Sequence, residues 1–228
     1  MLPLRDANPT RHTPYVTITL IVINVLVFLF EFVLDLNGTL GAFIGRWGFR
    51  PATLQSDPLV AGVTIFSGMF LHGGWLHLGG NMLYLWIFGD NVEDRLGGVR
   101  FIIFYLLTGV LATLAQWAIE PNSIIPVIGA SGAISGVLGA YLLLYPRAQI
   151  TTAIFVVIFY TVRKLPAVLV LAGYFVIQLF QGTLSLQEAG ASGGGVAFFA
   201  HLGGFAAGFL LVKLFEIGRD SPNHILRG

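Results

Sequence analysis

The sequence of 228 residues contains no cysteine, which excludes disulfide bonds, thiolate metal ligands and cysteine nucleophiles. Charged residues are scarce as well: they make up 10% of the chain, against about 25% in a typical soluble domain. So few charges cannot cover a surface that faces water, and a soluble globular protein, a disordered chain and a coiled coil are therefore excluded. The net charge of +1 provides no basic field that would attract nucleic acid, so nucleic acid is not an expected partner.

The sequence is rich in long apolar stretches. Hydrophobic residues make up 56% of it, and the mean hydropathy is +0.83. Six stretches without charge are long enough to cross a bilayer, which takes about 20 residues. We therefore predict an all-α membrane protein in which residues 1–228 form one domain with six transmembrane helices. The expected helices are 16–36, 74–89, 100–118, 129–145, 165–182 and 197–215.

A seventh uncharged stretch, residues 148–162, is too short to span a bilayer. We expect it to lie at the membrane interface or to form an extended loop between the fourth and fifth helices.

The placement of lysine and arginine predicts the orientation of these helices. Such residues collect on the cytoplasmic side of membrane proteins. With six spans, only Arg46 and Arg50 of the 12 positively charged residues fall on one side, and the rest fall on the other. Both termini are therefore predicted to be cytoplasmic. A bacterial inner membrane is the simplest expected location, because no transit-type sequence precedes the first helix.

Polar side chains within the expected spans mark candidate functional positions, because burying them in lipid is costly. His77 and Asn81 have the i, i+4 spacing that puts two side chains on one face of a helix. Ser131 lies at the outer end of the fourth helix, and His201 lies about one turn into the sixth. All four residues are thus expected near the outer face of the membrane.

Glycines indicate how the serine and the histidine would meet. A small-residue pattern starts at Gly132 in the fourth helix and another at Gly204 in the sixth, each with a second glycine four residues later. Such patterns let two helix backbones approach closely in lipid. If Gly132 faces Gly204, Ser131 and His201 differ in depth by about 3 Å. The spacing therefore predicts a hydrogen bond between the hydroxyl and the imidazole.

This pairing points to nucleophilic catalysis. A serine hydroxyl attacks well only when a neighbouring base takes its proton, and the His201 imidazole is the candidate base. The developing oxyanion needs donors, for which the Ser131 backbone N–H, the Asn81 amide and the His77 ring are suitable. The acidic residues nearest in sequence fall in expected outer loops, so we predict a dyad and not a triad. A zinc site is not expected, since the spans offer no carboxylate or thiolate to assist the histidines, and no cofactor is predicted.

These residues stand in motifs that together resemble the rhomboid family of intramembrane serine proteases. The resemblance covers the chain from about Phe70 to Val212. Its pieces are His77-x3-Asn81, Gly129-Ala130-Ser131-Gly132, Ala200-His201-x2-Gly204-x3-Gly208 and, as a smaller match, Glu93-Asp94-Arg95-Leu96-Gly97.

The resemblance implies a six-helix bundle whose active site opens to water from the outer face. It implies that Ser131 is the nucleophile, His201 the general base, and His77 and Asn81 partners of the oxyanion. It also implies a cap over the site at 190–195 and a lateral gate for substrate at the fifth helix. Two positions depart from the family pattern: Ser135 stands where many members have an aromatic residue, and Val63-Thr64 where many have Trp-Arg.

The expected activity is therefore endopeptidase cleavage of transmembrane segments in other membrane proteins. Substrates would be segments with weak helix propensity near the cleaved bond, since an intact helix hides its carbonyls. Two other functions remain open: a catalytically silent rhomboid-like protein that binds membrane clients, and a small transporter. The presence of both Ser131 and His201 argues against the first, and the lack of paired broken repeats argues against the second.

Overall fold

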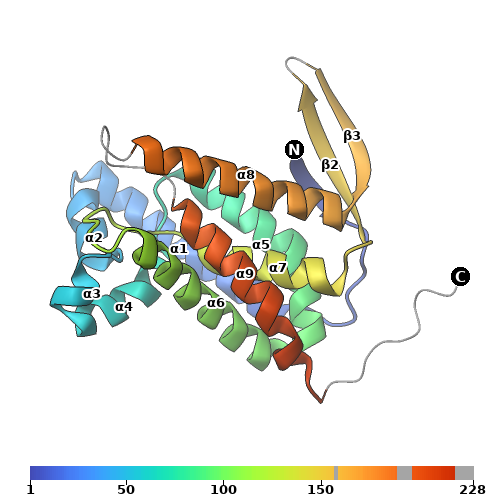
Figure 1. Cartoon of the computed structure of the whole chain (residues 1–228), viewed down its shortest axis with the longest axis horizontal. Coiled ribbons are helices and arrows are strands. Elements are labelled where there is room, and N and C mark those ends of the chain that lie inside the picture. The colour runs from blue at the N-terminus through green and yellow to red at the C-terminus, as the bar shows by residue number, and fades with distance from the viewer. Residues whose placement is uncertain (157–158, 189–196, 219–228) are drawn as a thin grey trace, which may run out of the picture.

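The computed structural model describes residues 1–156, 159–188 and 197–218, most of which are helical (Figure 1). A helix overlaps each of the six ranges expected from the sequence. These helices are α1 (Tyr15–Leu36), α5 (Trp75–Leu96), α6 (Gly98–Ile119), α7 (Ser131–Leu144), α8 (Ala167–Glu188) and α9 (Phe198–Glu216). Three shorter helices cover one end of the bundle: α2 (Leu40–Trp47), α3 (Thr53–Ser56) and α4 (Pro58–Gly68).

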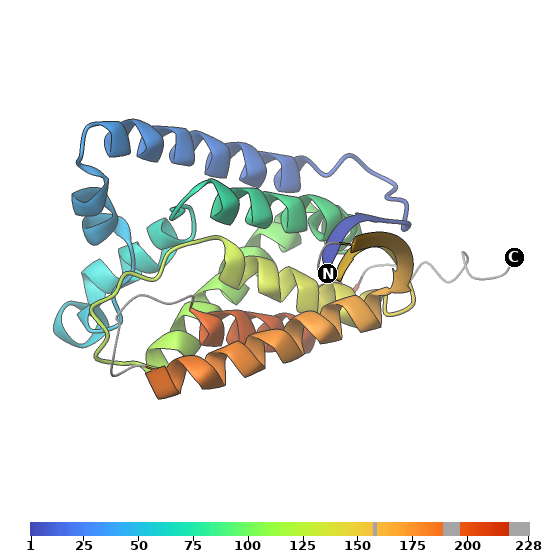
Figure 2. The same ribbon diagram turned by 90° about the horizontal axis from the view of Figure 1, so that it is seen from above.

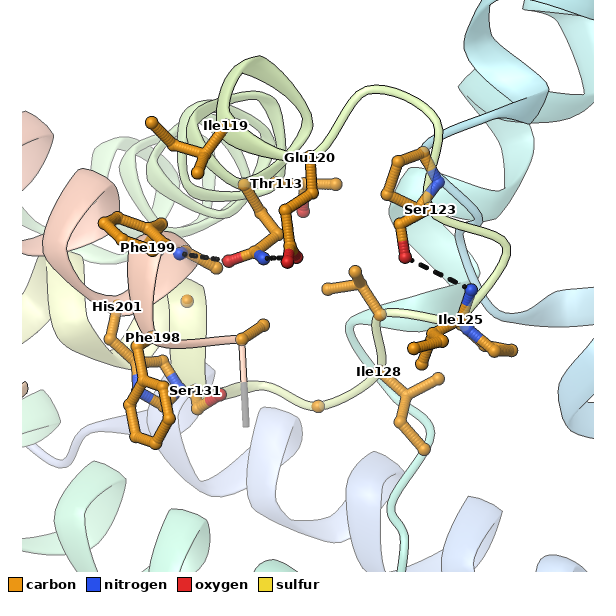
Figure 3. Close-up of a pocket in the computed structure, with 18 of the residues that line it drawn as sticks. Thr113, Ile119, Glu120, Ser123, Ile125, Ile128, Ser131, Phe198, Phe199 and His201 are labelled. Atoms are coloured by element: carbon orange, nitrogen blue, oxygen red, sulfur yellow. Dashed lines mark hydrogen bonds between the residues drawn. The ribbon is translucent and has the colours of Figure 1, made fainter. Parts of the chain in front are cut away.

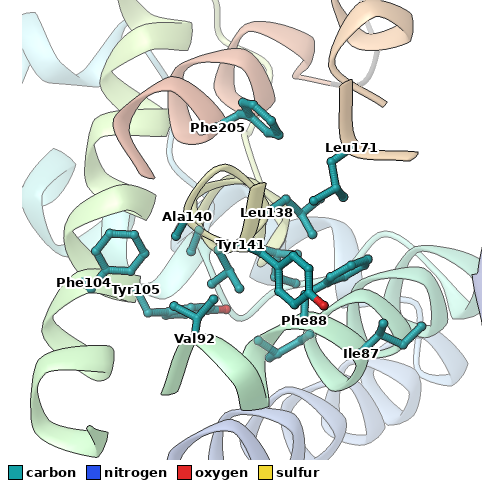
Figure 4. Close-up of a cluster of buried hydrophobic side chains, with 14 of the residues drawn as sticks. Ile87, Phe88, Val92, Phe104, Tyr105, Leu138, Ala140, Tyr141, Leu171 and Phe205 are labelled. Carbon is teal, nitrogen blue, oxygen red and sulfur yellow. The ribbon is translucent and has the colours of Figure 1, made fainter. Parts of the chain in front are cut away.

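Helix α7 is the centre of the bundle. It contacts α5, α6, α8 and α9, whereas α1 and α8 lie at opposite edges (Figure 2). Every residue from Ala133 to Tyr141 is buried. The Tyr141 ring meets the Phe88 ring of α5 edge to face, with centroids 4.9 Å apart, and Leu138 points toward Leu171 of α8 (Figure 4). The first residue of this enclosed helix, Ser131, therefore has a fixed position.

The closest contact in the bundle joins α7 and α9 through glycines. A Cβ atom on Gly204 would collide with the carbonyl oxygen of Gly132, and one on Gly208 would collide with that of Gly136. These are the small-residue faces that the sequence indicates, and Gly132 does face Gly204. Close backbone approach increases the van der Waals contact between helices, which stabilises association where lipid surrounds the protein.

The prediction of an all-α fold is wrong in one region, because three strands form a small antiparallel sheet. The strands are β1 (Leu2–Asp6), β2 (Gln149–Val156) and β3 (Phe159–Pro166), in the order β1-β2-β3. The stretch 148–162, expected to be interfacial or a loop, thus contributes to a hairpin that projects sideways from the bundle (Figure 1). Strand β2 is rich in isoleucine, threonine and valine, whose branched side chains favour a pleated strand over a helix. The fifth helix accordingly begins at Ala167 and not at 165.

Charged residues at the end of α5 tie three helices together near this sheet. The Glu93 carboxylate accepts hydrogen bonds from the backbone N–H groups of Val16 and Thr17, at 2.9 and 2.7 Å, and so caps the start of α1. A carboxylate at a helix N-terminus both pairs free N–H groups and interacts favourably with the helix dipole. Arg95 pairs with Glu216 of α9. Helix α5 therefore continues through this charged segment to Leu96 instead of ending near residue 89.

The N-terminal strand is fixed to the bundle through Asp6. Its carboxylate accepts hydrogen bonds from the Tyr141 hydroxyl, at 2.8 Å, and from the Asn91 side chain, at 2.9 Å. Burial raises the pKa of Asp6, while these hydrogen bonds act in the opposite direction. The sheet is thus attached to the far end of α7 from Ser131.

Not all six expected spans pass a test of length and hydropathy. Within the described residues, α1, α6 and α9 are long and apolar enough to cross a membrane. Helices α4, α7 and the segment Ala167–Phe180 of α8 are apolar but shorter. Helix α5 ends in the charged segment that binds α1 and α9. The count of six spans and the cytoplasmic termini remain predictions.

The glycine contact between α7 and α9 leads to a test of the fold. Gly208→Ala should lower the free energy of unfolding by about 1–3 kcal/mol, because the added methyl group has no space beside Gly136. The matched control is Gly62→Ala in α4, where an added Cβ would meet nothing within 4 Å. Thermal unfolding in one detergent would compare them, and equal unfolding temperatures would contradict the proposed packing constraint.

Candidate active site

Ser131 is the first residue of α7 and follows a tight turn of the backbone. Gly129 has a φ of +118°, a conformation that side-chain-bearing residues rarely adopt, and Ala130 is the N-cap. The carbonyl of Ala130 accepts the Ile134 N–H at 3.0 Å, which starts the helix. The N–H of Ser131 itself has no acceptor within the helix, as at any helix N-terminus. A hydroxyl and a backbone donor that the helix leaves unpaired therefore lie on the same residue.

The structure brings His201 to this hydroxyl. His201 lies in the first turn of α9 and is buried, with 8% of its surface exposed. Its Nε2 atom is 2.7 Å from Ser131 Oγ, a normal hydrogen-bond distance. The contact joins two helices that pack through their glycines. It confirms the hydrogen bond predicted from the similar depths of Ser131 and His201. A hydroxyl that donates to an imidazole nitrogen is poised to lose its proton as it attacks.

The other ring nitrogen of His201 also has a partner, which the sequence analysis missed. Nδ1 is 2.8 Å from Oε1 of Gln178, on α8. The partner is a neutral amide and not a carboxylate. The only signal for Gln178 in the sequence is that it is a polar residue within an apolar helix. This signal does not identify the residue that Gln178 contacts.

His77 lies beside the serine, with Gly129 as the spacer between them. A Cβ atom on Gly129 would be 2.7 Å from His77 Nε2 and 3.5 Å from Ser131 Oγ. The ring is oriented from its other side, where Nδ1 accepts the N–H of Gly73 at 3.3 Å. The neutral ring then carries its hydrogen on Nε2, which is the ring nitrogen on the side of Ser131.

Asn81 lies one turn after His77 on α5 and is buried, with 8% of its surface exposed. Its Nδ2 atom has no hydrogen-bond partner among the described residues. Buried donors are nearly always paired, so an unpaired one needs an explanation. Unlike His77, Ser131 and His201, Asn81 is not among the described residues that line the cavity over the site.

A cavity of about 980 Å³ opens above the serine, at the end of the bundle covered by α2, α3 and α4. Ser131, His201 and Phe198 lie on one side of it, and Ser123 and Ile125 lie opposite (Figure 3). Gln116 of α6 accepts the N–H of Ala200 at 3.2 Å and so fixes the start of α9 at the cavity edge. The cavity is large enough for an extended peptide segment together with water.

Two polar residues beside the site are buried. Glu31 and His72 have only 0% and 1% of their surfaces exposed. The Glu31 carboxylate accepts the backbone N–H of His72 at 3.1 Å, which fixes the segment before α5. The predicted cap at 190–195 lies outside the described residues.

Ser135, which stands where the family pattern has an aromatic residue, is also accounted for. Its hydroxyl is 3.0 Å from the hydroxyl of Tyr174 on α8. An aromatic side chain thus reaches this region from α8 instead of from α7, and the bond links the two helices.

Comparison with known proteins agrees with these motifs. Residues 61–216 match the family model of the rhomboid domain, which covers more than half of the chain. The chain belongs to the rhomboid family. It is therefore an integral membrane protein, and its serine and histidine lie within the matched rhomboid domain.

Several curated rhomboid proteins are similar to the chain. Rhomboid-like protein 11, chloroplastic, of Arabidopsis thaliana is 35% identical over 155 residues, which cover 64% of this chain and 50% of that protein. Rhomboid protein 1, mitochondrial, of Saccharomyces cerevisiae is 37% identical over 106 residues, covering 45% and 31%. Rhomboid protease GluP of Bacillus subtilis is 41% identical over 78 residues, covering 34% and 15%. The chain thus spans half or less of each. The names of the first two include a chloroplast and a mitochondrion, so these comparisons do not support the predicted bacterial inner membrane.

The unpaired donor of Asn81 allows a functional role to be separated from a structural one. Asn81→Leu keeps the number and branching of the side-chain heavy atoms and removes a donor that has no partner among the described residues. We expect the unfolding temperature in detergent to stay the same or to rise, because replacing an unsatisfied buried polar group with an apolar one costs little. A drop equivalent to more than about 1 kcal/mol would mean that Asn81 supports the helix.

Proposed function

We propose that this rhomboid-family protein is an intramembrane serine endopeptidase that uses Ser131 and His201 as a dyad. The observation that carries the proposal is the 2.7 Å contact between Ser131 Oγ and His201 Nε2, at a helix N-terminus and under a cavity. A packing serine needs no such partner, and a histidine that only fills the core needs no serine. The relative named a rhomboid protease supports the same chemistry.

In the first half of the reaction, Ser131 Oγ attacks the carbonyl carbon of the peptide bond while its proton moves to His201 Nε2. The resulting oxyanion accepts hydrogen bonds from the Ser131 N–H and from the His77 and Asn81 side chains. His201 then donates its proton to the leaving amine nitrogen. The C–N bond breaks, which leaves an acyl ester on Ser131 and releases one product with a new N-terminus.

Water completes the second half. A water molecule from the cavity attacks the ester carbon, and His201 takes its proton and returns one to Ser131 Oγ. The second product leaves with a new carboxylate, and the dyad is restored. Water must reach a residue within a membrane protein, and the cavity over Ser131 provides the space for it.

The substrates we propose are membrane proteins whose transmembrane segments unwind easily near the cleaved bond. A peptide carbonyl in a helix is covered by its own hydrogen bond, so attack requires local unwinding. Residues of weak helix propensity lower that cost by roughly 0.5–1 kcal/mol each. With six spans and cytoplasmic termini, cleavage takes place near the outer face, because Ser131 lies at the end of the bundle opposite the N-terminal strand.

Labelling with a fluorescent fluorophosphonate tests the dyad without a known substrate. Wild-type protein should be labelled on Ser131, whereas Ser131→Ala should not react and His201→Ala should react at least about 100-fold more slowly, because it lacks the base. Cleavage of model transmembrane peptides, followed by mass spectrometry, should show the same losses. Asn81→Leu should lower kcat by about 100-fold, as removal of an oxyanion donor does.

Matched controls lie away from the site. Ser67→Ala in α4 and His12→Ala near the sheet remove the same side-chain types from positions that do not line the cavity, and both should keep wild-type labelling. Near-wild-type cleavage by Ser131→Ala would overturn the mechanism. A folded wild-type protein that is neither labelled nor active would favour the silent, client-binding alternative.

A further inference from the structure

Gln178 is an unusual residue for its surroundings. It lies on α8 among apolar side chains that face outward, including Val176, Ile177 and Leu179. A polar amide in a membrane helix is costly and therefore marks either a helix contact or a functional position. Its Oε1 atom is bonded to Nδ1 of His201, the proposed general base.

The His201 ring makes two hydrogen bonds of different kinds. A neutral imidazole has one N–H donor and one acceptor nitrogen. Because Gln178 Oε1 can only accept, it places the ring hydrogen on Nδ1. Nε2 is then the acceptor, which is the state needed to receive the Ser131 hydroxyl at 2.7 Å. With the hydrogen on Nε2 instead, His201 could not take the proton from the serine.

Helix α8 holds Gln178 in place through a neighbour one turn away. Tyr174 and Gln178 have i, i+4 spacing and so lie on one face of the helix. Tyr174 bonds Ser135 of α7 while Gln178 bonds His201 of α9. The Phe175 and Phe205 rings, with centroids 5.0 Å apart, join α8 to α9 as well. These contacts fix the rotation of α8 about its axis, and so they hold the Gln178 amide beside His201.

We propose that Gln178 is a positioning residue that fixes both the tautomer and the orientation of His201. This inference rests on the proposed function, since it gives the base of that reaction a second hydrogen-bond partner beside Ser131. The arrangement is an amide-oriented dyad, in which Gln178 acts through His201 and does not touch the substrate.

Two substitutions separate this role from simple packing. Gln178→Leu removes the acceptor, and kcat should fall by about tenfold or more with KM unchanged, because the ring loses its fixed orientation. Gln178→Glu keeps an acceptor oxygen at the same position and should restore most of the activity. It should also move the acid limb of the pH–rate profile to higher pH, because a carboxylate favours the protonated imidazole. Val176→Leu, on the outward side of α8, is the control and should behave as wild type.

A measurement independent of activity reports the tautomer directly. The ¹⁵N chemical shifts of the His201 ring distinguish protonated from unprotonated nitrogen, and the wild type should carry its hydrogen on Nδ1. Gln178→Leu should lose that preference, and Gln178→Glu should keep it. Assignment of the His201 signals would use His201→Ala.

The outcomes separate this inference from the proposed function. Wild-type kcat in Gln178→Leu, or an unchanged Nδ1 signal, would overturn the positioning role while the dyad stands. The positioning role would also be overturned if Gln178→Leu and Gln178→Glu lost the same activity and had equally lowered unfolding temperatures. Such a result would indicate that Gln178 only makes a structural contact. An inactive wild type with the hydrogen on Nδ1 would instead reject the protease and leave the tautomer assignment intact.

Discussion

The backbone contact between α7 and α9 is the constraint on which the site depends. Two glycines on each helix remove the side chains that would keep the backbones apart, so the helices meet closely where Gly132 faces Gly204. Ser131 and His201 lie within one turn of that crossing. Their 2.7 Å contact is therefore set by the helix packing and requires no separate loop to align it. Catalytic geometry held by helices tolerates less movement than geometry held by loops.

The two ends of the bundle differ in how fully their buried polar groups are hydrogen-bonded. Near the sheet, Glu93 and Asp6 accept several hydrogen bonds each, and Arg95 is paired, so this end fixes the helices relative to one another. Near Ser131, by contrast, Nδ2 of Asn81 lacks a partner among the described residues, and a cavity lies over the serine. An unpaired buried donor costs stability, and such costs concentrate at sites that gain a partner only when a ligand binds.

The sequence predicts the site better than it predicts its supports. Gaps between charges indicate the long helices, and glycine spacing sets the relative depth of Ser131 and His201, because both signals are linear along the chain. The hairpin is not predicted, because length alone does not distinguish an interfacial stretch from a strand; the β-branched residues of β2 are the signal that favours a strand. The contact of Gln178 with His201 depends on the rotation of α8 about its axis, which spacing along one chain does not fix. The contact between Glu31 and the backbone N–H of His72 likewise depends on how α1 is rotated about its axis, which the sequence does not fix.

The presence of an amide instead of a carboxylate beside His201 fits the apolar surroundings of the site. A carboxylate there would stabilise the imidazolium during catalysis, but it would remain a charge within a membrane helix whenever the histidine is neutral. Gln178 supplies the same acceptor geometry without that cost, so the resting dyad carries no net charge. In the proposed mechanism, the positive charge that forms on His201 in the transition state is then balanced by the oxyanion that forms beside it, close to His77. In that mechanism, charge separation is confined to the reacting atoms, which limits the charge that a site inside a membrane protein must carry.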